Sequence, residues 1–237
     1  MEEPMSHSSY RTALIVGAGS GLSASIARAF AKADIAVALA ARTVEDLAPV
    51  AAETGAKLFA CDATDRNQVA RLFAGVSESI GAPDAVVYNA SYRVSGPFAE
   101  LDPAEVEKSL AVSAFGGFLV AQEAVRRMLP RAHGAMLFTG ASASVKGYAH
   151  SAPFAMGKFA LRGLAQSMAR ELAPRGIHVA HFVIDGGIGS ARRTQPAEAS
   201  DSLLDPDAIA ASYLHILQQP RSAWTWEMEL RPWVEKF

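Results

Sequence analysis

The chain has a single cysteine, Cys61, among its 237 residues, so it cannot form an internal disulfide. Its net charge of −2 provides no strong positive field for nucleic acid or acidic membranes. No apolar run approaches the roughly 18 residues that a membrane-spanning helix needs. Residues 1–10 lack the basic and apolar regions of a signal peptide and are expected to form a flexible arm. These absences favour a cytoplasmic protein that binds neither nucleic acid nor membrane.

Half of the residues are hydrophobic, which is enough for a sizeable core. Short apolar runs alternate with helical patterns at intervals of about 30 residues, as in parallel sheets with right-handed crossovers. The expected strands are 12–17, 35–41, 57–61, 84–89, 134–139, 177–184 and, near the end, 225–230. Most of these runs are continuously apolar, which is typical of strands covered on both faces. The pattern predicts an α/β fold: one Rossmann-like, doubly wound parallel sheet over residues 11–237, with helices on both faces.

Helical periodicity marks three long segments between the strands, at 65–80, 103–129 and 154–173. Asp65 and Gln68 have the spacing of a capping box at the start of the first segment. The segment at about 185–206 has little periodicity and follows the sixth strand, at the edge where ligands bind in such sheets. Two interpretations remain open for it, a substrate lid or a plain surface loop. Arg192 and Arg193 within it are either solvated or in contact with an anionic substrate.

A glycine-rich turn joins the first strand to an amphipathic segment. Gly17-Ala18-Gly19-Ser20-Gly21 follows the apolar run directly, and Leu22 begins the helical pattern. Glycines let the backbone approach a pyrophosphate, and the first N–H groups of a helix face it. We therefore expect Gly17, Gly19, Ser20, Gly21 and Leu22 to bind a dinucleotide, although a purely structural turn would also use glycine.

The end of the second strand bears on the choice between NAD and NADP. An NAD site usually carries an acid there for the ribose 2′-hydroxyl. Here the sequence is Ala40-Ala41-Arg42-Thr43, and no carboxylate occurs before Glu45. Arg42 suits a 2′-phosphate, because a guanidinium binds phosphate in bidentate fashion. The residues favour NADP(H) over NAD(H), with a solvated Arg42 as the alternative.

Polar residues also end the third and fourth strands. Asp62, followed by Ala63, can accept a hydrogen bond from an adenine amino group or cap the next helix. Asn89, followed by Ala90, can face a cofactor or brace neighbouring strands. We expect these four residues in the cofactor site. No metal-ligand spacing is evident, because His178 and His181 are three apart on a strand and so face opposite sides.

Taken together, these motifs resemble the short-chain dehydrogenase/reductase family over essentially the whole chain. The resemblance is carried by GAGSGLS at 17–23, Asp62, YNAS at 88–91, Gly140 to Ser144, Lys158 and Asp185-Gly186. It implies a seven-stranded Rossmann sheet, an NAD(P) cofactor that Gly186 and Ile188 also contact, and a homodimer or homotetramer.

The resemblance also implies a catalytic set, from which this chain departs. In the family a serine and a tyrosine contact the reacting carbonyl, a lysine holds the nicotinamide ribose and lowers the tyrosine pKa, and an asparagine completes a proton relay. Lys158 is the residue of this set that the chain keeps. Phe154 stands at the tyrosine position, Ser113 at the asparagine and Ala141 at the serine. Ser142 and Ser144 are the nearest hydroxyls, and a small loop shift would bring Ser142 into place.

Reduction of a ketone requires a proton donor, and phenylalanine has no proton to give. Losing such a donor costs roughly 10²–10⁴ in rate. Lys158 can still orient the ribose or protonate through water, and Tyr92, Tyr148 and His150 are candidate substitutes. The prediction is an NADP-dependent oxidoreductase acting on a small carbonyl or alcohol with a non-standard proton donor. The alternatives are a catalytically silent NADP-binding sensor or partner protein, and a reductase of activated alkenes.

Overall fold

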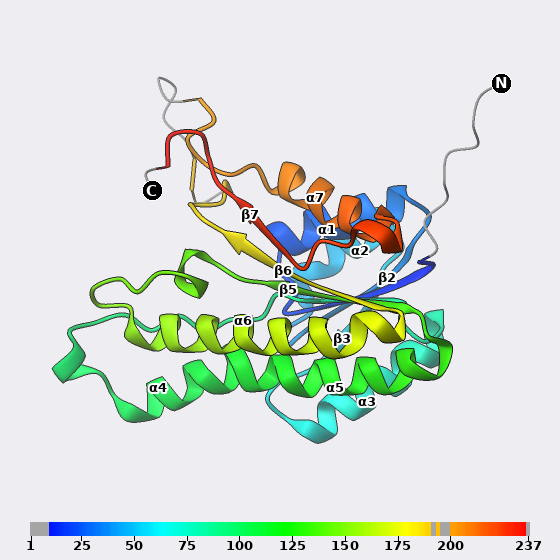
Figure 1. Ribbon diagram of the computed structural model, residues 1–237, viewed down its shortest axis with the longest axis horizontal. Coiled ribbons are helices and arrows are strands. Elements are labelled where there is room, and N and C mark those ends of the chain that lie inside the picture. Colours follow the sequence, from blue (N-terminus) through cyan, green and yellow to red (C-terminus); the bar gives the residue numbers. More distant parts are fainter. Residues whose placement is uncertain (1–9, 191–192, 195–199, 236–237) are drawn as a thin grey trace.

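The computed structural model describes residues 10–190, 193–194 and 200–235. Seven parallel strands form one sheet in the order β3-β2-β1-β4-β5-β6-β7 (Figure 1). Their bounds are β1 Thr12–Val16, β2 Ala36–Ala41, β3 Lys57–Ala60, β4 Ala85–Tyr88, β5 Gly134–Thr139, β6 Ile177–Ile184 and β7 Glu227–Leu230. Each expected strand is present to within two residues at either end. The predicted doubly wound parallel sheet is confirmed, and its strand order reverses between β1 and β4.

Helices cover both faces of the sheet (Figure 1). One layer holds α1 (Leu22–Lys32), α2 (Ala48–Thr54) and α7 (Pro206–Gln218), and the other holds α3 (Arg66–Ile80), α4 (Pro103–Leu110), α5 (Gly116–Met128) and α6 (Ala152–Leu172). Successive residues of β6 alternate between the two cores: Phe182 packs in the α1/α7 core, and Val179 packs in the α5/α6 core. Because both faces are buried, apolar residues run continuously along the strands.

The predicted helix 103–129 is interrupted. A π-helical turn over Ala111–Phe115 separates α4 from α5. The Tyr88 hydroxyl of β4 donates a hydrogen bond of 2.5 Å to the Val112 carbonyl within this turn. A Cβ on Gly116 would lie 2.5 Å from that hydroxyl, so the glycine permits the close approach of α5 to β4. Periodicity alone did not indicate the interruption, because it depends on a partner from a distant strand.

Two local expectations need correction. Asp65 caps α3 by accepting from Asn67 N and Gln68 N, but Gln68 does not close the expected capping box. Its side-chain oxygen instead accepts from Asp62 N at 2.9 Å. The expected arm 1–10 also extends one residue too far. Tyr10 is buried and its ring stacks on His133 with centroids 4.8 Å apart, whereas residues 1–9 lie outside the described residues.

The segment 185–206 closes on itself at its base. Ile188 pairs with Leu204, Gly189 N–H donates to the Leu204 carbonyl at 2.8 Å, and Ser190 pairs with Arg193. Residues 191–192 and 195–199 of this segment lie outside the described residues. Helix α7, which the sequence analysis left unassigned, begins directly afterwards at Pro206, with Asp205 as its N-cap. It packs on α1, and Tyr213 stacks on Phe182 of β6 with centroids 3.7 Å apart.

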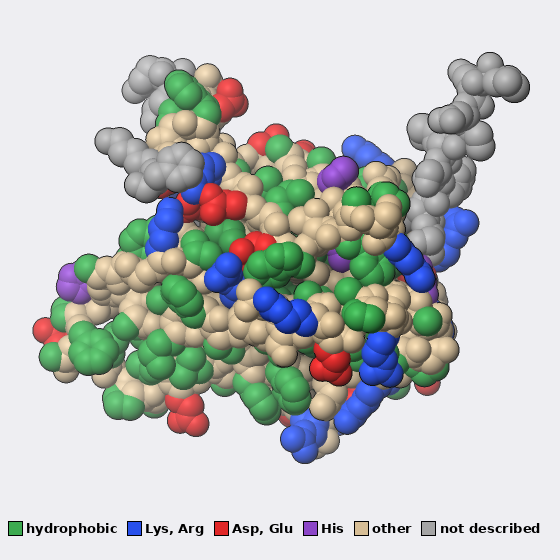
Figure 2. Space-filling model, in the orientation of Figure 1, with side chains coloured by type: hydrophobic (Ala, Val, Ile, Leu, Met, Phe, Trp, Pro, Cys, Tyr) green, Lys and Arg blue, Asp and Glu red, His purple; other side chains and the backbone are tan. Residues whose placement is uncertain are grey.

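Large apolar side chains are exposed on the outer face of α5 and α6. Phe115, Phe118, Met156 and Phe159 are each exposed by 41–50%. Phe115 and Phe118 line a shallow apolar hollow together with Leu110 and Leu164. Figure 2 shows hydrophobic side chains gathered over this helical layer, toward its α4 end. None of the helices in the described ranges is long and apolar enough to cross a membrane.

Candidate functional site

The glycine turn after β1 is held between two neighbouring strands. Gly17 N–H and Ala18 N–H both donate to the Ala40 carbonyl of β2 at 2.9 Å. Gly17 has φ +79°, and a Cβ there would lie 2.3 Å from the Ala90 nitrogen after β4. A side chain is therefore excluded at Gly17 by both backbone conformation and contact. At Gly19 and Gly21, by contrast, an added Cβ would meet open space.

The start of helix α1 lacks a side-chain cap. Gly21 occupies the N-cap position, no side chain accepts from the first N–H groups, and the first turn contains no acidic residue. The first N–H groups of a helix have no partner within the helix and carry a partial positive charge. The turn from Gly17 to Leu22 therefore presents backbone donors suited to an anion such as a diphosphate.

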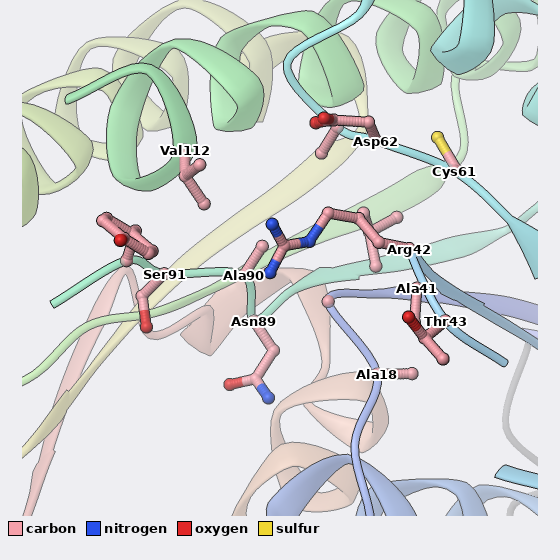
Figure 3. Close-up of a pocket in the computed structure, with 14 residues that line it drawn as sticks. Ala18, Ala41, Arg42, Thr43, Cys61, Asp62, Asn89, Ala90, Ser91 and Val112 are labelled. Atoms are coloured by element: carbon pink, nitrogen blue, oxygen red, sulfur yellow. The ribbon is translucent and has the colours of Figure 1, made fainter. Parts of the chain in front are cut away.

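A cavity of about 330 Å³ opens beside this turn, at the carboxyl ends of β1, β2, β3 and β4. It is lined by Val16, Gly17, Ala18, Ala41, Arg42, Thr43, Cys61, Asp62, Ala63, Asn89, Ala90, Ser91, Tyr92 and Val112. Figure 3 shows the Arg42 side chain extending into this cavity, with its guanidinium directed toward Ala90. The Glu45 carboxylate instead accepts from Val44 N at 3.0 Å, within its own turn. The cavity thus has a cation at the end of β2.

Asp62 and Asn89 both line the cavity and both brace its walls. Asp62 Oδ1 accepts from the backbone N–H and the hydroxyl of Thr64, at 2.9 and 2.8 Å. Asn89 Nδ2 donates to Ser23 Oγ at 2.8 Å, which ties the end of β4 to helix α1. For Asn89 the two interpretations left open, bracing and facing a cofactor, are therefore compatible. Asp62 does not cap α3, because Asp65 is the N-cap, and it lines the cavity while bonding Thr64.

A second cavity of about 390 Å³ continues from the first, and Asn89 and Ser91 line both. It is lined by Leu22, Asn89, Ser91, Arg93, Thr139, Gly140, Ala141, Ser142, Ala143, Tyr148, Ser151, Phe154, Lys158, Ile184, Gly186, Ile188 and Arg193. The fold thus brings together residues that the sequence predicted from four separate segments: Leu22, Ser142, Phe154 with Lys158, and Gly186 with Ile188.

Lys158 is the buried cation of the second cavity. Its side chain is in the first half of α6 and is 3% exposed. Nζ donates to the Thr139 carbonyl at 2.8 Å and lies 5.8 Å from the centroid of the Phe154 ring. Burial disfavours the charged amine and lowers the pKa of Lys158 from 10.5 to about 8. Near neutral pH this amine can therefore act as a cation and as a proton donor.

The serines selected from the sequence differ in position. Ser142 lines the second cavity, whereas Ser144 is buried and its hydroxyl accepts from Ala141 N at 3.1 Å. Ser113, in the π-helical turn, is also buried and accepts from Tyr92 N at 3.3 Å. A Cβ added to Gly157 of α6 would lie 2.7 Å from the Ser113 Cβ, so Ser113 packs against α6. Ser113 is not among the residues that line either cavity.

Of the aromatic and imidazole candidates, Tyr148 is the one that lines the second cavity within the described ranges, and it is 49% exposed. The Tyr92 hydroxyl donates to Glu105 at 2.6 Å and accepts from Lys108 at 3.2 Å, both on α4. His150 is exposed on the loop before α6 and lines neither cavity. Sequence position therefore did not distinguish these three residues, whereas the loop geometry does.

Two arginines complete the second cavity. Arg193 lines it, while Arg192 lies outside the described residues. Arg93, which the sequence analysis did not select, follows β4, and its Cζ lies 5.3 Å from the centroid of the Phe154 ring. Its place two residues beyond the YNAS segment, at the carboxyl edge of the sheet, was the available signal.

Comparison with known proteins assigns the class. A family model described as short chain dehydrogenase matches residues 11–199, and the chain belongs to this family of oxidoreductases. Carbonyl reductase family member 4 of Xenopus tropicalis is 26% identical over 214 residues, which cover 87% of this chain and 90% of the relative. D-threitol dehydrogenase of Mycolicibacterium smegmatis is 29% identical over 174 residues, covering 71% and 67%.

Solved structures agree with this assignment. A short-chain dehydrogenase from Rhodopseudomonas palustris is 35% identical and superimposes with a TM-score of 0.82, covering 94% of this chain and 99% of that one. A metagenomic short-chain oxidoreductase in complex with NADP is 27% identical, with a TM-score of 0.82 and coverage of 94% and 97%.

Proposed function

We propose that this protein transfers hydride between NADP(H) and a small carbonyl or alcohol substrate, with a proton donor other than tyrosine. The observation that carries the proposal is the continuity of the two cavities. One opens beside the uncapped glycine turn and contains Arg42, and the next contains the buried Lys158. A dinucleotide bound along them would extend from the end of β2 to α6.

The residues present fit a phosphorylated dinucleotide. Backbone donors from Gly19, Ser20, Gly21 and Leu22 would hold the diphosphate, and Arg42 would bind the 2′-phosphate. Gly17 would contribute by letting the backbone turn tightly, because its own N–H already donates to the Ala40 carbonyl. Asp62 and Ala63 would border the adenine, while the nicotinamide end would meet Asn89, Ala90, Gly186 and Ile188. The bound cofactor supplies the hydride. The structure with NADP that is 27% identical to this chain supports this choice of cofactor.

The chain's own groups must bind the substrate oxygen and supply a proton. Lys158 would hold the nicotinamide ribose and, with its pKa near 8, release a proton at neutral pH directly or through water. Ser142 would donate a hydrogen bond to the substrate oxygen, and Tyr148 is a second possible donor. Phe154 and Ser113, at the tyrosine and asparagine positions of the family pattern, supply no proton.

A silent NADP-binding sensor or partner protein is the second candidate. It is favoured by the same substitutions, because Phe154 and Ala141 offer no polar hydrogen and Ser113 is turned away from both cavities. Under this interpretation the cofactor binds tightly without turnover. A reductase of activated alkenes is a further variant, since conjugate reduction needs no strong acid beside residue 154.

Calorimetry followed by kinetics tests the proposal. We expect NADPH to bind at least tenfold more tightly than NADH, and Arg42→Ala to remove this difference, because a guanidinium–phosphate pair is worth about 1.5–3 kcal/mol. NADPH oxidation with a panel of ketones, aldehydes and enones should reveal turnover that Lys158→Ala abolishes. Binding of neither cofactor would refute both the enzyme and the sensor. Binding without turnover on any class would favour the sensor.

Phe154→Tyr separates the remaining alternatives. A large gain in ketone reduction would indicate an enzyme that lacks only an efficient acid. Turnover of enones but not ketones by the unchanged protein would assign the alkene chemistry. The apolar face of α5 and α6 supports a homodimer or homotetramer as part of the same proposal, and a cytoplasmic location fits a small-molecule oxidoreductase of this kind.

A further inference from the structure

The charged side chains that line the second cavity are all cationic in the described part of the chain. The lining includes the cations Arg93, Lys158 and Arg193, and no aspartate or glutamate is among the lining residues that the structure describes. A recess with one sign of charge raises the local concentration of the opposite sign. We infer that the substrate is an anion, a short oxo acid or the matching hydroxy acid, whose carboxylate binds Arg93. This inference rests on the proposed function and specifies its substrate class.

Arg93 is arranged to receive such a group. Its side chain is exposed, its guanidinium lies over the Phe154 ring with Cζ 5.3 Å from the centroid, and no ion pair involves it within the described ranges. The arginines of the fold's own ion pairs differ, since Arg131 and Arg162 each hold a carboxylate at 2.6 Å. A guanidinium that contacts only a ring face keeps N–H groups that a carboxylate can bind in bidentate fashion.

Both cations lie near the same ring. Lys158 Nζ is 5.8 Å and Arg93 Cζ is 5.3 Å from the centroid of Phe154. A substrate that reaches both would place its carbonyl near Lys158 and its carboxylate at Arg93. In the reaction, the carbonyl carbon accepts hydride from the reduced cofactor, the carbon–oxygen π bond breaks and the oxygen takes a proton, while the carboxylate remains unchanged.

Arg193 is assigned separately because its surroundings differ. The Arg193 side chain lies against Gly187, the residue before Ile188. A Cβ added to Gly187 would come within 2.8 Å of Arg193 Nη1 and would also approach Leu203. Arg193 follows Ile188 in the segment after β6, and both residues line the second cavity. The cofactor diphosphate and a substrate carboxylate are both anions, so the experiment must distinguish which of them each arginine serves.

Matched pairs of substrates test the inference. Short 2- and 3-oxo acids are compared with their neutral methyl esters and amides, with NADPH as reductant. We expect the acids to have a kcat/KM at least tenfold higher than the esters. Arg93→Ala should lower kcat/KM for the acids roughly 10- to 100-fold and change the esters less than twofold, with NADPH affinity preserved. Arg93→Lys should restore only part of the loss, because ammonium is not bidentate.

Two further variants provide the controls. Arg193→Ala should raise the Kd of NADPH while the preference for acids persists, which assigns Arg193 to the diphosphate. Arg170→Ala changes an exposed arginine of α6 that bonds only its own helix backbone, and should leave every parameter unchanged. Esters that react as well as acids, or an acid preference that survives Arg93→Ala, would overturn the inference.

A binding measurement separates this inference from the proposed function. Oxamate, an unreactive isostere of a short oxo acid, is titrated calorimetrically into the protein with and without NADP⁺, beside the neutral oxamide. We expect oxamate to bind, oxamide not to bind, and Arg93→Ala to weaken oxamate at least tenfold. This result would hold even if no substrate turned over. Equal binding of oxamate and oxamide would contradict an anion site whatever the outcome of the kinetics.

Discussion

At the scale of single residues, the burial of Lys158 is unfavourable for stability but places its amine in the second cavity. Its amine is buried with the Thr139 carbonyl as its hydrogen-bond partner and no carboxylate against it. An uncompensated buried cation opposes folding, and perturbed ionisable groups in a cavity are frequent in active sites. The neighbouring Phe154 ring offers only a weak cation–π contact at 5.8 Å. The position of Lys158 is therefore better explained by binding than by stability.

Lys158→Met should stabilise the protein at neutral pH. The folded pKa of about 8 lies below the unfolded value of 10.5, so the unfolded chain binds more protons between these values and stability rises with pH through this window. We expect the variant to gain about 3 kcal/mol in unfolding free energy at pH 7 and less toward pH 10. Urea unfolding at pH 7 and 9.5 measures this. The control is Lys32→Met, at the exposed end of α1, and an unchanged pH slope in Lys158→Met would contradict the argument.

At the scale of elements, a partly buried polar network joins β6, β7 and α6. Glu227 of β7 accepts two hydrogen bonds from Arg162 of α6, at 2.6 and 2.7 Å, and its Oε2 lies 3.1 Å from His181 Nδ1 of β6. The Arg162 guanidinium holds the pKa of Glu227 below its usual value. Because β7 is short and lies at the sheet edge, this network fixes it to the α6 that carries Lys158.

This network should make the fold sensitive to acid. Burial lowers the pKa of His181 from 6.5 to about 4, so the unfolded chain binds more protons between these values and stability falls as pH decreases through them. We expect a loss of about 3 kcal/mol between pH 6.5 and 4 beyond that of His181→Asn. Denaturant titrations across this range measure the difference. His215→Asn, at an exposed site of α7, should retain the parental slope, and the same slope in His181→Asn would refute the assignment.

At the scale of the whole molecule, the exposed apolar face of α5 and α6 is the most extensive departure from a polar surface in the view of Figure 2. Phe115, Phe118, Met156 and Phe159 are each exposed by 41–50%. Contiguous exposed apolar groups of this kind are typical of protein–protein interfaces. Of the two helices, α6 also carries Lys158, and α5 follows the π-helical turn directly.

Phe118→Glu should dissociate the proposed homo-oligomer. A carboxylate at the centre of an apolar interface is desolvated without a partner, which costs several kcal/mol across a symmetric contact. Light scattering coupled to size exclusion should give a dimer or tetramer for the parent protein and a smaller species for the variant. Phe98→Glu changes a phenylalanine that is 82% exposed outside this face, and should leave the mass unchanged. A monomeric parent protein would contradict the proposal.

The backbone of the site was more predictable than its side-chain chemistry. Apolar runs predicted the first six strands and an alternating pattern near residues 225–230 predicted the seventh, and the glycine turn lies where the pattern indicated. Ser113 was selected by its place in the family pattern, yet it packs against Gly157 and lines neither cavity. Arg93 was missed because its contact with Phe154 joins a loop after β4 to the first turn of α6, 61 positions apart in the chain.

The order of apolar runs and turns determined by itself that this chain forms a doubly wound parallel sheet with a glycine turn after its first strand, because burial on both faces and the steric freedom of glycine are local requirements. The tertiary structure decided which polar groups share a cavity, since the loops after different strands converge only once the sheet has formed. It likewise decided the ionisation of Lys158, because desolvation depends on everything that surrounds the amine.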